Sequence, residues 1–150
     1  MRPLAPSSAE ITTMVYPTEL EERVRYLLLT LAGGEGDLKL EEEKFTSHYG
    51  YSFKVLTVKL GKGAAESLLK RVICFLDELD FLSLMSTLES HVDGRDLYIR
   101  LDKQELALGR YELFSGGSGG YVRIKLTFRK KVSDLESLLR EVRENQCPAI

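Results

Sequence analysis

The residues most capable of chemistry alternate with apolar residues along two segments, 97–102 and 121–129. Successive side chains of a β-strand point to opposite faces, so each segment predicts a strand with one apolar and one polar face. The polar face combines aromatic rings with cations. Such a face suits single-stranded or looped RNA, in which bases stack on rings and phosphates contact Arg and Lys. Its principal members are Tyr98, Arg100, Tyr121, Arg123 and Lys125.

The charge distribution bears on this interpretation. The whole chain has 21 basic and 23 acidic residues, a net charge of −2, which excludes binding to nucleic acid by bulk charge alone. Residues 95–131 nevertheless carry 9 basic and 4 acidic residues (+5), whereas residues 1–92 carry 10 and 14 (−4). An acidic chain can therefore still carry a basic patch. An ordinary solvated antiparallel face alternates in the same way, so an interpretation without RNA stays open.

Four more residues complete the candidate RNA-binding set. Lys103, Gln104 and Arg110 follow the first strand and are expected to contact phosphates or base edges. His48 stands beside Tyr49 in a predicted turn between strands. It is a candidate for stacking on a base, although such a pair also packs over a sheet edge in many proteins.

Motifs for catalysis and metal binding are missing from the sequence. His48 and His91 have no Cys, His or Asp partners at ligand spacing, and no GxSxG motif is present. The glycine cluster at 116–120 lacks the Lys-Ser/Thr pair of a phosphate-binding loop and precedes a strand, so it predicts a hairpin loop. We therefore expect no catalytic residues, no metal and no cofactor.

The two cysteines do not indicate a disulfide framework. Cys74 lies in the apolar run 72–76 and is expected to be a thiol in the core, whereas Cys147 lies in the tail and is expected to be exposed. Whether the two pair with each other stays open at this point.

Apolar periodicity predicts the elements that position the candidate residues. The expected strands are 9–16, 38–44, 53–60, 97–102 and a hairpin of 110–114 with 121–129. Segment 38–44 alternates only weakly and is acidic, so it is expected to be a short or edge strand. The expected helices begin near residue 18, cover 63–92 in two parts, and resume at 133, with one further helical turn at 103–108. The expected helix caps are Thr18 with Glu21, Asp80, and Ser133 with Glu136.

This order of elements predicts one α+β domain over residues 1–150. It is expected to be a two-layer sandwich, with a mostly antiparallel sheet and helices packed on one face. Residues 1–8 are expected to be a flexible lead-in and 147–150 a tail. No apolar run approaches the roughly 18 residues that cross a bilayer. The N-terminal residues lack the pattern of a signal peptide, so a cytoplasmic location is expected.

Four stretches of sequence resemble a known family. They are Tyr-Pro-Thr-Glu at 16–19, Ser-His-Tyr-Gly at 47–50, Arg-Leu-Asp-Lys-Gln at 100–104 with Leu-Gly at 108–109, and Val-Arg-Ile-Lys at 122–125. In this order they resemble the archaeal family described as predicted exosome-subunit, RNA-binding proteins, over about residues 9–145. The resemblance implies a fold similar to the large-subunit ribosomal protein that binds 5S RNA, and to a double-stranded-RNA-binding domain.

The expected function is therefore non-catalytic binding of structured or ribosomal-type RNA. The resemblance further implies association with exosome or ribosome proteins. The alternative is a protein-interaction module, or a homodimer whose second copy covers the open face of the sheet. A small hydrolytic or phosphoryl-transfer enzyme is the least favoured class, because no nucleophile, base or metal cluster is visible.

Overall fold

The structure is a computed structural model that describes residues 5–33, 39–117, 119–130 and 134–148. Its strands are β1 (Ser8–Val15), β2 (Leu40–Thr46), β3 (Ser52–Leu60), β4 (Val92–Asp93), β5 (Asp96–Asp102) and β6 (Tyr121–Thr127). Its helices are α1 (Glu21–Leu31), α2 (Lys62–Phe75), α3 (Glu78–Ser86), α4 (Lys103–Ala107), α5 (Leu135–Asn145) and the 3-10 helix η1 (Leu88–His91).

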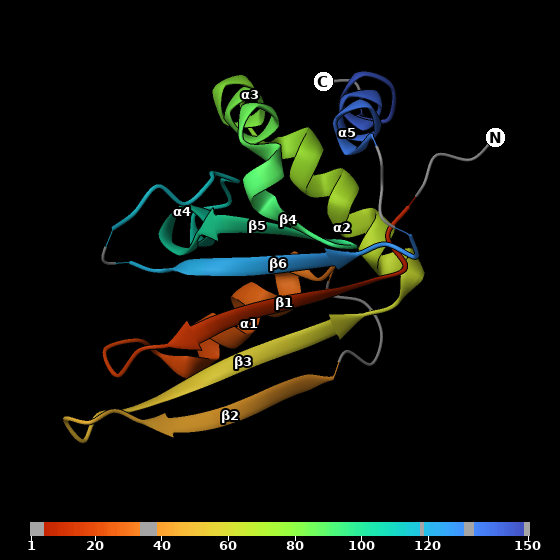
Figure 1. Ribbon diagram of the computed structural model, residues 1–150. Helices are drawn as coiled ribbons and strands as arrows, with labels where there is room; N and C mark the ends of the chain where they lie inside the picture. The colour runs from red at the N-terminus through yellow and green to blue at the C-terminus, as the bar shows by residue number, and fades with distance from the viewer. Residues whose placement is uncertain (1–4, 34–38, 118, 131–133, 149–150) are drawn as a thin grey trace.

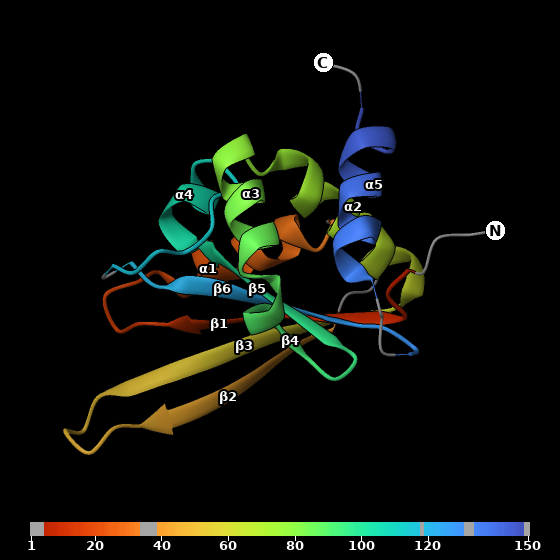
Figure 2. The same cartoon turned by 45° about the horizontal axis from the view of Figure 1, so that its top comes forward.

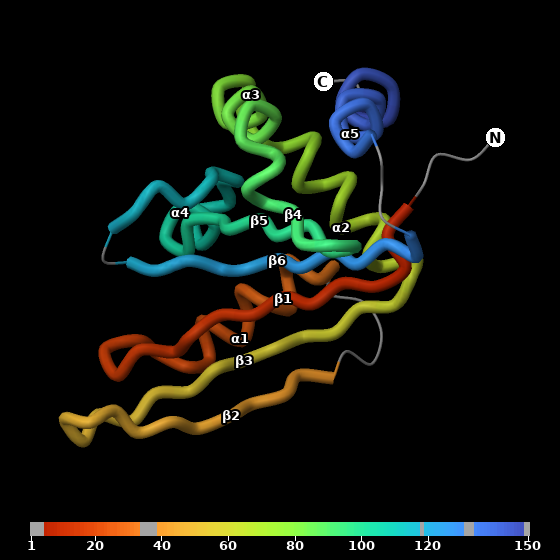
Figure 3. The backbone as a smooth tube through the Cα atoms, in the orientation of Figure 1, coloured from red at the N-terminus to blue at the C-terminus, as the bar shows by residue number. Residues whose placement is uncertain are grey.

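The six strands form one antiparallel sheet in the order β2-β3-β1-β6-β5-β4. The helices lie on one face of this sheet and leave the other face open (Figures 1 and 2). β1, near the N-terminus, lies beside β6, near the C-terminus (Figure 3). The expected α+β architecture is confirmed, and β2 is the edge strand that its weak alternation predicted.

The core lies between the sheet and the helices, and its centre is a row of three isoleucines. Ile11 of β1 pairs with Ile124 of β6, which pairs with Ile99 of β5, and all three are fully buried. Burial of such side chains contributes about 1.5–3 kcal/mol each. The alternation in β5 and β6 therefore directs one face into the core and the other into solvent, as the sequence predicted.

The helix starts differ from the predicted caps. Helix α1 begins at Glu21 without a side-chain cap, so the capping box of Thr18 with Glu21 is wrong. Glu21 instead forms ion pairs with Lys54 of β3 and with Arg25. The hydrogen bond from Lys54, and to a lesser extent that from Arg25, holds the pKa of Glu21 below its usual range. These cations hold the carboxylate against the sheet and away from the helix start.

Helices α2 and α3 are separate, as predicted, but the N-cap of α3 is Asp77 rather than Asp80. The side chain of Asp77 accepts from the backbone N–H of Asp80 at 2.7 Å. Asp80 accepts from the N–H of Leu113 at 2.8 Å and so holds the segment before the glycine loop. At α5 the cap is Asp134, which accepts from the N–H of Ser137, whereas the predicted cap Ser133 lies outside the described residues.

The predicted core thiol is also wrong, because Cys74 of α2 forms a disulfide with Cys147 beyond α5. Cys74 is half-buried rather than part of the core. Next to the disulfide, Arg143 of α5 donates from Nη1 to the carbonyls of Ile73 and Leu76, at 2.8 and 2.7 Å. Ile73 lies in the last turn of α2 and Leu76 is the residue that follows it, where C-terminal carbonyls lack helical partners. The disulfide and Arg143 together fasten α5 to α2.

Candidate nucleic-acid interface

The open face of β5 and β6 carries the residues that the alternation singled out. In the register of these strands Arg100 lies directly opposite Arg123, and Tyr98 lies directly opposite Lys125. Their neighbours in sequence are buried against the helices, so these four side chains share the open face. Tyr121 begins β6 on the same face. We call these five residues the basic strip.

The rings and guanidinium groups of the strip contact one another. The Cζ atom of Arg100 lies 4.8 Å from the ring centroid of Tyr121, and that of Arg123 lies 5.6 Å from the ring centroid of Tyr98. Tyr121 also packs against Phe114, with 5.1 Å between ring centroids. Cation–π contacts of this kind hold a guanidinium over a ring while its N–H groups stay available to an acceptor. The strip is thus preorganised for anions and for flat rings.

The cations of the strip have no carboxylate partner among the residues that the structure describes. No ion pair within 4.0 Å involves Arg100, Arg123 or Lys125 there. Like charges directly opposite on a sheet destabilise it, and Arg100 with Arg123 is such a pair. A bound polyanion would relieve this repulsion. By contrast, the cations that do form ion pairs are Arg25, Lys54, Lys59, Lys103, Arg110 and Arg140.

Charge changes sign across the open face. Glu41 and Glu43 of the edge strand β2 lie on it, opposite Thr57 and Val55 of β3. Lys59 pairs with Glu41 at 3.6 Å. The face is therefore acidic along β2, whereas over β5 and β6 it carries Arg100, Arg123 and Lys125. Carboxylates border these cations: Glu10 of β1 stands opposite Lys125, and Asp96 and Asp102 lie at the two ends of β5, where they accept from Thr127 and cap α4.

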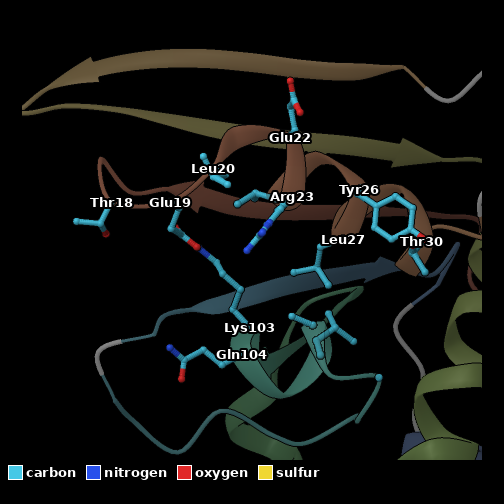
Figure 4. A pocket seen from close by; sticks show the side chains of 14 residues that line it. Thr18, Glu19, Leu20, Glu22, Arg23, Tyr26, Leu27, Thr30, Lys103 and Gln104 are labelled. Carbon is cyan, nitrogen blue, oxygen red and sulfur yellow. The ribbon is translucent and has the colours of Figure 1, made fainter.

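Lys103 does not belong to this surface. It is 4% exposed, and its ammonium donates to the carbonyl of Met14 at 2.6 Å and to Oε1 of Glu19 at 2.9 Å. It also lies 4.6 Å from the ring centroid of Tyr16. Figure 4 shows Lys103 of α4 and Glu19 of the loop before α1 pointing toward each other. The sequence suggested a phosphate contact, but burial leaves this ammonium no access to one, and it joins α4 to the loop instead.

Replacing Glu19 with Gln is expected to destabilise the protein by about 3 kcal/mol, because the buried ammonium of Lys103 then lacks a compensating charge. Urea unfolding followed by circular dichroism measures this loss. The double variant Glu19→Gln, Lys103→Met removes both charges and is expected to recover much of the stability. A single variant that unfolds like the unmodified protein would contradict a structural role for this pair.

Gln104 and Arg110 lie at the end of the sheet, around α4, rather than on the basic strip. Gln104 is exposed and packs closely over Gly119, where an added Cβ would lie 2.6 Å from its Cδ. Arg110 pairs with Glu105 at 3.2 Å. Partial burial, and to a lesser extent the negative charges of Glu105 and Asp80, raise the pKa of the nearby Glu112. Arg110 therefore lies among acidic groups that already balance its charge.

The predicted hairpin of 110–114 with 121–129 is wrong. The segment before the glycine loop lies along β5 instead: Leu113 bridges Leu101, and Phe114 N–H donates to the carbonyl of Arg100 at 2.9 Å. The two strands beside β6 are β1 and β5, which leaves no edge for a third. Gly120 has φ +81° and lies close to the Tyr16 ring, so both its backbone conformation and this close approach favour a glycine at position 120.

His48 lies apart from the strip, in the turn between β2 and β3, and is exposed there. Aromatic residues that sequence reasoning did not select surround it on the same hairpin. The sequence feature that could have identified them is the density of aromatic residues. The nine positions 45–53 hold four besides His48: Phe45, Tyr49, Tyr51 and Phe53.

His91 has a structural role. Its ring nitrogens contact Thr87 Oγ1 and the carbonyl of Tyr98, at 3.2 and 3.1 Å. Within the described ranges, no group of three or more His, Cys, Asp or Glu residues is arranged to hold a metal ion. No helix in this part of the chain is long and apolar enough to span a bilayer.

The protein is thus an α+β module with an open antiparallel sheet, helices on one face and a cationic, tyrosine-bearing strip on the other. A family model described as RNA binding matches residues 8–129. The chain belongs to this RNA-binding family.

Solved structures of archaeal proteins share the fold. A DUF54 protein from Archaeoglobus fulgidus is 29% identical, with a TM-score of 0.70, over 93% of this chain and 98% of that one. DUF54 proteins from Sulfolobus solfataricus and Methanothermobacter thermautotrophicus are 20% and 24% identical, with TM-scores of 0.77 and 0.69. Each of these two matches covers 93% of this chain, and 98% and 96% of the respective relative. No curated protein matches the sequence significantly. These descriptions mention neither the exosome nor 5S RNA, so that part of the resemblance stays a prediction.

Proposed function

We propose that this protein is a non-catalytic RNA-binding module that holds structured RNA on the basic strip. Arg100, Arg123 and Lys125 contact phosphates, and Tyr98 and Tyr121 stack on accessible bases. One observation carries the proposal: two arginines stand directly opposite each other with no carboxylate partner among the described residues. Membership of an RNA-binding family supports it.

The resemblance to a family described as exosome subunits extends this proposal to a role beside exosome or ribosome proteins. The alternative of a homodimer with an apolar interface has less support from the open face. The open-face positions of β1, β5 and β6 are polar, charged or tyrosine except at Met14, which is 38% exposed and stands opposite Val55 of β3.

The salt dependence of binding tests the proposal. We expect the protein to bind a labelled RNA stem–loop, with log affinity falling linearly against log salt concentration. Replacing Arg123 with Gln is expected to flatten this slope by about 0.7–0.9, the contribution of one phosphate contact. Lys62→Gln, on the exposed side of α2, makes the same charge change and is expected to leave the slope unaltered. Absence of binding at low salt, or equal slopes for Arg123→Gln and the unmodified protein, would overturn the proposal.

A further inference from the structure

The β2–β3 hairpin carries a second group of aromatic residues, away from the basic strip. Phe45 and Phe53 lie directly opposite each other, with ring centroids 5.4 Å apart and ring planes at 16°. At the turn, Tyr49 is 87% exposed and Tyr51 is 65% exposed. Exposed apolar side chains that gather in one place mark interaction sites. We call these four residues, together with His48, the hairpin cluster.

The turn that presents the cluster has a defined conformation. Ser47 N–H donates to the carbonyl of Tyr51 at 2.8 Å, and Tyr51 N–H donates to Oγ of Ser47 at 3.1 Å. Figures 1 and 2 show the hairpin extending past the end of β1, with no helix over its tip. The turn backbone is therefore held in place and its tyrosine rings are left uncovered, and a fixed backbone lowers the entropy cost of presenting these rings to a ligand.

The paired rings of the cluster lie on the same face of the sheet as the basic strip. Glu42 of β2 contacts Arg25 of α1, so the even-numbered positions of β2 face the helices and Phe45 faces the open side. From β3 to β6 the sheet spans two strand spacings, about 10 Å. One RNA can therefore contact both the strip and the cluster.

The carboxylates of β2 favour contact of the hairpin with RNA bases over contact with RNA phosphates. Glu41 and Glu43 stand on the same side of β2 as Phe45 and would repel phosphates. Aromatic rings attract bases regardless of sequence, because every base presents a flat face. The hairpin is thus suited to bases that have left the duplex and unsuited to the sugar–phosphate backbone.

We infer that the hairpin cluster is a second subsite, which stacks unpaired bases of the RNA whose phosphates lie on the basic strip. This inference rests on the proposed function and narrows its ligand to structured RNA with an unpaired loop or overhang. A fully paired blunt duplex contacts the strip alone and binds more weakly.

The double variant Tyr49→Ala, Tyr51→Ala tests this subsite. Removing one stacking ring costs about 1–3 kcal/mol per base, so we expect affinity for an RNA stem–loop to fall by about 10-fold or more. Affinity for a blunt duplex of equal length is expected to stay within about twofold, and the salt slope to stay unchanged because no phosphate contact is lost. Tyr49→Phe, Tyr51→Phe keeps both rings and is expected to retain binding. Tyr26→Ala on α1, 74% exposed on the helical side, is the matched control and is expected to bind normally.

Three outcomes would overturn the inference: an unaltered affinity for the stem–loop, an equal loss for the stem–loop and the blunt duplex, or an equal loss from Tyr26→Ala. Its failure is distinguishable from failure of the proposed function. If only the subsite is wrong, Arg123→Gln still flattens the salt slope while the tyrosine variants do nothing. If RNA binding itself is wrong, the unmodified protein binds neither RNA.

Discussion

Replacing both Arg123 and Lys125 with Glu is expected to weaken the binding of an RNA stem–loop by about 100-fold or more. A hydrogen bond to a charged group is worth about 1.5–3 kcal/mol, so two lost phosphate contacts amount to at least about 3 kcal/mol. The fold should persist, because both side chains lie on the open face: a Glu at position 123 would stand opposite Arg100, and a Glu at position 125 would stand opposite Glu10 at a cost of about 1 kcal/mol or less. Fluorescence anisotropy with labelled RNA measures the affinity, and thermal unfolding checks the fold.

The control for this experiment must change net charge equally without touching the strip. Lys62 and Lys70, both exposed on α2, meet this requirement when replaced by Glu. Arg143 does not, because its guanidinium binds the last carbonyls of α2 and packs over Phe81. Equal losses of affinity from the two double variants would mean that general electrostatics, rather than a located surface, governs binding.

Replacing Ile124 with Asp is expected to abolish cooperative folding. Ile124 is fully buried between Ile11 and Ile99, so the change removes a central side chain and places a carboxylate in the core. The combined cost exceeds about 5 kcal/mol, which is comparable to the whole stability of a typical domain. Circular dichroism and thermal unfolding measure the result.

Thr12→Asp is the matched control for the core. Thr12 is in β1 and faces Arg123 on the open side of the same sheet. A carboxylate there stays near solvent and next to a cation, so the expected change in stability is about 1 kcal/mol or less. If Thr12→Asp unfolds the protein and Ile124→Asp does not, the assignment of the two faces is reversed.

Site residues could be placed from the sequence where their position depends on a local pattern, and not where it depends on contacts with distant segments. The period-2 alternation in β5 and β6 is a local property of the chain, and it correctly placed Tyr98, Arg100, Arg123 and Lys125 on one face. Lys103 belongs to no alternating segment. Its burial follows from contact with Met14 and Glu19, more than eighty positions away, and no local pattern reports such a contact.

The same reasoning explains the errors in the fold. Whether segment 110–114 pairs with β6 depends on which strands already flank β6, and β1 occupies one side because a strand from the start of the chain returns there. The disulfide likewise requires α5 to pack beside α2, which brings Cys147 within 5.4 Å, Cα to Cα, of Cys74. Neither spacing nor composition encodes that distance.

The sequence by itself determined the α+β class and the inward and outward faces of the central strands, because burial repeats every second residue along a strand. Only the tertiary structure decided that Arg100 stands opposite Arg123, that Lys103 is enclosed and that aromatic residues of the hairpin share the open face with the strip. These facts depend on strand register and on contacts between distant segments. Register is set by packing of the whole sheet, and a shift of one residue would turn every side chain of a strand to the other face.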